Sequence, residues 1–184
     1  MDLRAPRLCD RSFPAYRFVP GTGMPHPICS PAGHSYLPRN LRLPYRAEFD
    51  PPRFAESTDY LFGVDCYNHG YFWEAEAAFE ACVRTIEGQR DQERFFRALM
   101  QAAACHLKIL VHHVDGATAL GNRAALLLRA AASELGDRIN GVDAKSYAKS
   151  IERYLDSVLD TDPPVHDPKC FPYLEVATGP RRLH

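Results

Sequence analysis

Proline is absent from residues 53 to 162, the long middle stretch of this 184-residue chain. Ten of its fifteen prolines lie between residues 6 and 52, and the other five follow residue 162. Because proline removes a backbone hydrogen bond and clashes inside a helix, the middle is free to be helical throughout and the flanks are not. This predicts a proline-rich extended arm at 1–50, a helical-bundle domain at 51–162 and an irregular tail at 163–184.

Apolar residues in the middle stretch recur every three or four positions, as on the buried face of a helix. Glycines separate these periodic segments and mark the expected helix ends. The predicted helices run from a cap at Asp50 to about Asn68, from Tyr71 to Glu87, from Asp91 to Val114, from Gly116 to Leu135, and onward from a cap at Asp143. Short connections make neighbouring helices antiparallel, so we expect an all-α, single-domain bundle of about five helices with the arm and tail packed on it.

Composition excludes several classes of protein. The net charge of −1 and the 24% of charged residues match an ordinary globular protein and give no electrostatic reason to bind nucleic acid or an anionic membrane. The longest apolar run is short and is interrupted by His106 and Lys108, so it cannot span a bilayer. The six cysteines form no CxxC pair and the N-terminus lacks the apolar segment of a signal peptide. We expect a cytoplasmic monomer or small homo-oligomer.

The arm is basic and the helical middle is acidic. Residues 1–52 carry seven arginines against four acidic residues, whereas residues 53–162 carry twelve basic and seventeen acidic residues. We expect the arm to lie across the bundle, although this attraction is weak and is screened by salt. The expected apolar anchors are Phe13, Tyr16, Phe18, Ile28, Tyr36 and Leu37. The alternatives are an arm that completes a functional site, and a disordered arm that becomes ordered on a partner.

Four polar residues lie on or beside the apolar faces of the second and third predicted helices. Glu76 lies at the edge of one face with Glu80 one turn beyond it, and His106 and His113 lie within the next. Two carboxylates four residues apart, with an imidazole from the neighbouring helix, could supply three ligands for a divalent ion. The simpler interpretation is a solvated flank paired with arginines and a hydrogen-bonded core histidine.

The arm carries two histidines of its own, His26 and His34, eight residues apart. Convergence of these imidazoles with Glu80 or His106 would complete a metal site, because neutral imidazole and carboxylate are common ligands of divalent metals. The sequence lacks GxSxG, HExxH and phosphate-binding glycine loops. We expect no cofactor. A divalent metal is expected only if four residues converge on one site: His26, His34, Glu80 and His106.

Two resemblances cover parts of the chain. YLFGVDCYNHGYFWEAEAAFEACVRTI looks like a single tetratricopeptide unit, with no second copy at a shift of 34 residues. HGYFWEAEAAFEACVR, then RFFRALMQAAACHLKI and GATAL, resembles the bacterial family called domain of unknown function 309, and VPGTGMPHPICSPAGHSY looks like the arm of its longer members. The matching residues are Trp73, Glu74, Ala75, Glu80, Leu99, Gln101, Ala103 and Ala104.

That resemblance implies a small all-helical domain, and it implies no reaction, because the family has no established one. The family pattern has His then Glu where this chain has Glu76 and Ala77, so any role of that histidine is absent here or has passed to a carboxylate. We expect a non-catalytic domain that binds a protein partner or small molecule in a groove between the tetratricopeptide-like hairpin and the third helix. The candidate residues are Trp73, Glu74, Glu76, Glu80, Gln101 and His106. The alternative is a metal-dependent hydrolase whose carboxylate and histidine site lies between the second and third helices and the arm.

Overall fold

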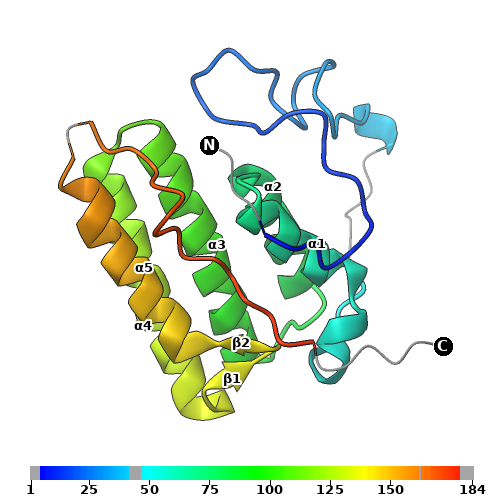
Figure 1. The fold of residues 1–184 in the computed structure, drawn as a ribbon. Coiled ribbons are helices and arrows are strands. Elements are labelled where there is room, and N and C mark those ends of the chain that lie inside the picture. Colours follow the sequence, from blue (N-terminus) through cyan, green and yellow to red (C-terminus); the bar gives the residue numbers. More distant parts are fainter. Residues whose placement is uncertain (1–4, 42–46, 162, 179–184) are drawn as a thin grey trace.

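The computed structural model describes residues 5–41, 47–161 and 163–178. It confirms the predicted all-α fold, a helical bundle with an irregular arm (Figure 1). The elements in chain order are the 3-10 helices η1 (Arg39–Leu41) and η2 (Pro51–Glu56), the α-helices α1 (Thr58–Asn68), α2 (Phe72–Val83), α3 (Arg90–Leu110) and α4 (Val114–Leu135), the strands β1 (Arg138–Ile139) and β2 (Val142–Asp143), and the α-helix α5 (Ala144–Leu159). No helix in the described part of the chain is long and apolar enough to cross a membrane.

Each α-helix packs mainly against its neighbours in the sequence, so the bundle follows chain order from α1 to α5. Figure 1 shows α3, α4 and α5 side by side, with the α1–α2 hairpin next to α3 and the arm on the outer side of that hairpin. Gly63 of α1 allows the two helices of the hairpin to meet closely, because a Cβ there would lie 2.8 Å from the ring of Phe79 on α2. Phe79 and Phe96 then connect the hairpin to α3, with ring centroids 6.3 Å apart.

Several helix ends differ from the prediction because local capping overrides apolar periodicity. The expected helix from Asp50 is divided: residues 51–56 form a kinked 3-10 segment, and α1 begins after Ser57, whose hydroxyl accepts a hydrogen bond from Tyr60 N. The third helix ends at Leu110 rather than Val114, and His112 follows with a φ of 54°. Helix α2 ends at Val83, short of the predicted Glu87.

The prediction that His113 faces inward is wrong, because His113 is an exposed helix cap. Its Nδ1 accepts a hydrogen bond from Gly116 N at 2.9 Å, so α4 begins at Val114 and not at Gly116. The cap predicted at Asp143 is confirmed, with its Oδ1 2.9 Å from Ser146 N. Before this cap lies a short antiparallel hairpin that the prediction missed. Its turn is Asn140–Gly141, both with positive φ, a pair typical of two-residue hairpin turns.

The arm and the tail both pack on the bundle. Phe18 is buried and Phe13 stacks on Tyr71 with ring centroids 4.7 Å apart, as the covering role requires, but the predicted anchors Ile28 and Leu37 are exposed. The tail passes over α3 and α5 in Figure 1. It buries apolar side chains, and the Asn68 side-chain amide hydrogen-bonds both N and O of Leu174 at 2.8 and 3.0 Å. The arm and the tail, far apart in sequence, therefore both pack at the turn between α1 and α2.

Candidate functional site

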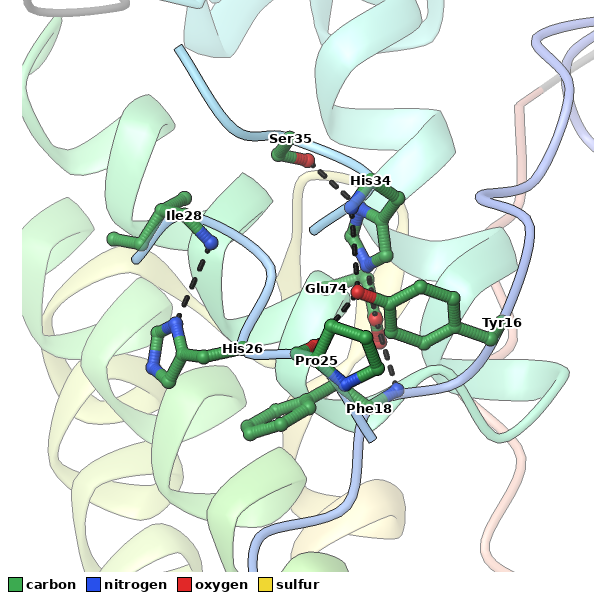
Figure 2. A network of polar contacts seen from close by, with 8 residues as sticks. All are labelled: Tyr16, Phe18, Pro25, His26, Ile28, His34, Ser35 and Glu74. Carbon is green, nitrogen blue, oxygen red and sulfur yellow. Dashed lines mark hydrogen bonds and ion pairs between the residues drawn. The ribbon is translucent and has the colours of Figure 1, made fainter. Parts of the chain in front are cut away.

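Glu74 is the predicted candidate around which the arm closes. It lies in the first turn of α2 and is buried, with 5% of its surface exposed. Figure 2 shows its carboxylate between the arm residues Phe18 and His34: Oε1 accepts the backbone N–H of Phe18 at 3.1 Å and lies 2.9 Å from Nε2 of His34. The other imidazole nitrogen, Nδ1, is 2.8 Å from Ser35 Oγ. Burial raises the pKa of Glu74, against the opposing effect of these hydrogen bonds.

Aromatic rings surround this carboxylate. The Trp73 ring is edge-on to Phe18 and His26, with centroid distances of 5.7 and 5.6 Å, and Tyr16 is edge-on to His34 at 4.7 Å. The hydroxyl of Tyr16 donates to Pro25 O at 2.7 Å, which ties two passes of the arm together. The structure thus brings four predicted residues to one place: Trp73, Glu74, His26 and His34.

The arm histidines take partners other than Glu80 and His106: His34 pairs with Glu74, and His26 packs against the ring of Trp73. Glu80 is exposed and pairs with Arg84 at 3.0 Å. In the described part of the chain no group of three or more His, Cys, Asp or Glu side chains has the arrangement of metal ligands. The four-residue metal set predicted from His26, His34, Glu80 and His106 therefore does not assemble, because its members take separate partners.

His106 is a core histidine. Its Nε2 lies 2.7 Å from Tyr67 Oη, and its ring stacks on Phe72 with centroids 4.8 Å apart. His166 of the tail is next to it, and Nε2 of His166 must donate to the backbone oxygen of His106 at 3.1 Å because a carbonyl only accepts. Burial lowers the pKa of His106 well below its usual range and that of His166 to about 4, so both are neutral near neutral pH.

A groove of about 620 Å³ lies across α3 between α2 and α4. It lies between the hairpin and the third helix, as the predicted groove would, but of the six candidate residues only Glu80 and Gln101 line it. We call it the arginine groove. Its lining residues are Glu80, Val83, Arg90, Glu93, Arg94, Arg97, Met100, Gln101, Arg123 and Leu127. Glu76 lies one turn before Glu80, half buried, with its pKa raised by burial and then by the Glu80 charge.

Among the residues that the structure describes, two of the four arginines in this groove have no acidic partner. Arg94 pairs with Asp91 at 2.6 Å and Arg97 more loosely with Glu93 at 3.6 Å. Within the described ranges, Arg90 and Arg123 make no ion pair, and both are exposed. The apolar lining residues Val83, Met100 and Leu127 are partly buried and pack against the core. The groove therefore combines an apolar floor with a cationic rim.

Sequence reasoning missed these arginines, although a signal for three of them was present. Arg90, Arg94 and Arg97 precede Gln101 by eleven, seven and four residues, a spacing that places all four on one face of a helix. Arg123 comes from another helix, and only the packing of α4 on α3 brings it to the same groove. A second groove, of about 770 Å³, lies between α5 and the tail and includes Tyr147 and Phe171.

Comparisons of this chain with protein-family models, with curated proteins and with solved structures return no match.

Proposed function

We propose that this protein is a non-catalytic binding domain whose arginine groove holds an acidic segment of a protein partner. The observation that carries the proposal is the convergence of four arginines from two helices on one groove, two of them with no acidic partner in the described residues. The surrounding helical stretch is acidic, with twelve basic and seventeen acidic residues between 53 and 162. A local excess of cations on an acidic domain supports selection for a negatively charged ligand.

The apolar floor supports a peptide rather than a small inorganic anion. Val83, Met100 and Leu127 offer partly buried carbon surface beneath the charged rim. A segment with leucine-like and carboxylate side chains would cover this floor and pair with the guanidinium groups of Arg90 and Arg123, which make no ion pair within the described ranges. Arginine is well suited to the role because its planar fork binds a carboxylate through two parallel hydrogen bonds. Nucleic acid is the poorer candidate, because the net charge of −1 gives no electrostatic reason for the chain to bind it.

The alternative prediction, a metal-dependent hydrolase, has less support. His34 and the Phe18 N–H already share Oε1 of Glu74, and Glu80 and His106 take other partners. We further propose a cytoplasmic location, since all six thiols are free and three are buried, as is typical of a reducing compartment. The resemblance to the bacterial domain of unknown function 309 family stays a proposal, supported by the Trp73–Glu74 pair at the start of the second helix of a packed helical hairpin.

A fluorescence-anisotropy titration tests the groove. The probe is a short fluorescein-labelled peptide with glutamates and leucines at helical spacing, and a lysine and leucine peptide is its charge control. We expect saturable binding of the acidic probe that weakens with added salt, because exposed charges are screened. Arg123→Gln should weaken binding about tenfold, or about 1.4 kcal/mol. The matched control Arg153→Gln, an exposed arginine of α5, should leave it unchanged. Equal binding by both variants would overturn the proposal.

A further inference from the structure

The α1–α2 hairpin presents two buried carboxylates to the arm: Asp65 accepts two backbone N–H groups of the arm and Glu74 accepts one. Asp65 of α1 has a fully buried side chain. Its Oδ1 accepts from Leu8 N at 2.8 Å, and its Oδ2 accepts from Cys9 N at 3.1 Å and from Nε of Arg7 at 2.8 Å. All of these donors lie in the arm. Without the arm, this carboxylate would have to be solvated or left unpaired, at high cost for a buried charge.

Glu74 of α2 repeats this arrangement further along the arm. It accepts the backbone N–H of Phe18 and pairs with the side chain of His34. Its second oxygen, Oε2, is buried and has no hydrogen-bond partner in the described part of the chain. Since every residue except proline supplies a backbone N–H, the two carboxylates recognise the main chain of an extended segment rather than one particular sequence.

Side chains add selectivity between these two points. The guanidinium of Arg7 lies 4.0 Å from the centre of the Phe13 ring, and that of Arg11 lies 4.3 Å from the ring of Phe62 on α1. Arg11 also binds Asp59 of α1 at 2.9 Å. Residues 5–18 form no helix, strand or hydrogen-bonded turn, so they lie on the hairpin as an extended peptide would, whereas residues 19–36 fold back through turns that bring His34 to Glu74. The hairpin thus offers negative charge and aromatic surface to an arginine-bearing chain.

We propose that this face of α1 and α2 is a binding site for extended, arginine-containing peptide segments, and that the arm is its intramolecular ligand. The ligand class is defined by the contacts of residues 7–9: an arginine followed by two residues that keep their backbone N–H groups, with an aromatic residue further on. A partner segment of this chemistry competes with the arm for Asp65 and Glu74. The site is separate from the arginine groove, which involves the other end of α2, so either proposal can fail without the other.

Covalent attachment explains why the site is closed in the intact chain. A tethered segment has an effective concentration that reaches the millimolar range for short connections, so it excludes a free peptide at micromolar concentration. Cutting the connection removes this advantage and leaves the contacts themselves unchanged. The proposal therefore predicts that a free arm peptide binds to the cut protein and not to the intact one.

The test uses full-length protein with a site-specific protease sequence inserted between Leu41 and Ala47. The folded protein is cut, incubated for a day with an excess of fluorescein-labelled synthetic peptide of residues 5–36 under reducing conditions, and separated from free peptide. We expect about one labelled peptide per cut protein and none on the uncut protein. A cut protein that takes up no label would show that the arm is a permanent part of the fold, and would overturn the proposal.

Substitutions in the peptide probe specificity without disturbing the protein. Leu8→Pro removes a backbone donor to Asp65, and Arg7→Ala removes its charged partner. Each should weaken uptake by at least about tenfold, because hydrogen bonds to a buried charge are among the stronger ones. Ser12→Pro is the matched control, since Ser12 is exposed and its N–H makes no hydrogen bond within the described residues. Equal weakening by all three peptides would contradict main-chain recognition by Asp65.

Discussion

Replacing Asp65 by asparagine should release the N-terminal part of the arm and destabilise the protein by about 2 kcal/mol, toward the lower end of the range of about 1.5–3 kcal/mol for hydrogen bonds to a charged group, since Arg7 is 33% exposed. Asparagine has the same shape, and its oxygen can still accept from Leu8 N. The amide nitrogen that replaces Oδ2 would face Arg7 Nε and Cys9 N, which are donors as well. The cost falls at the lower end because the released donors gain hydrogen bonds to water.

The matched control is Asp59→Asn on the same helix. Asp59 binds Arg11 of the arm at 2.9 Å and accepts the backbone N–H of Glu48 at 2.8 Å. The asparagine oxygen can keep the Glu48 bond, and the Arg11 guanidinium is 46% exposed, so the substitution should cost about 1 kcal/mol or less. Urea unfolding followed by the fluorescence of Trp73, the only tryptophan, measures both variants. Its ring touches Phe18, so its emission should also respond to movement of the arm. Equal free energies of unfolding for the two variants would refute the assignment of Asp65 as the buried anchor.

Two further predictions follow from burial. Because His106 and His166 have lowered pKa values, the unfolded chain binds more protons than the folded one below the usual histidine value of 6.5. The free energy of unfolding should therefore fall as the pH drops from 6.5 toward 4, by at most about 1.4 kcal/mol per pH unit for each histidine, and a His106→Gln, His166→Gln variant should show a smaller slope in urea titrations. Thiol titration of the folded protein should find Cys29 and Cys170 reacting first, since both are exposed, while Cys105, with a pKa raised to about 12 by burial, should react only after unfolding. An unchanged pH slope in the double variant, or early reaction of Cys105, would contradict the burial on which these predictions rest.

The helices were predictable because their signals are local. A long stretch without proline and apolar residues at three- and four-residue spacing need no knowledge of the tertiary structure. The helix ends were harder to predict. His113 fits the apolar spacing of the third helix, but its side chain accepts a hydrogen bond from Gly116 N and caps the fourth helix. Ser57 likewise displaced Asp50 as the first cap. Asn140–Gly141 did carry a recognisable hairpin signal in the sequence.

In the candidate sites, too, features that depend on local sequence were predictable and features that depend on tertiary packing were not. Trp73 and Glu74 were identified from a motif, and the partners of Glu74 were not, because the irregular path of the arm has no periodicity from which to predict where Phe18 and His34 will lie. The inward position of His106 was predicted from helical spacing, and its neutral state was not, since that depends on His166 from the tail. Three arginines of the groove follow from spacing on α3, whereas Arg123 requires the packing of α4.

A charge-swap titration of the arginine groove tests the central proposal most directly. The acidic and the basic peptide are each titrated against the wild-type protein and an Arg90→Glu, Arg123→Glu variant, both positions being exposed and without an ion pair in the described part of the chain. Circular dichroism confirms that the variant is folded. An acidic segment held by these arginines predicts that the wild type prefers the acidic peptide and that the variant prefers the basic one. Retention of the same preference by the variant would contradict it.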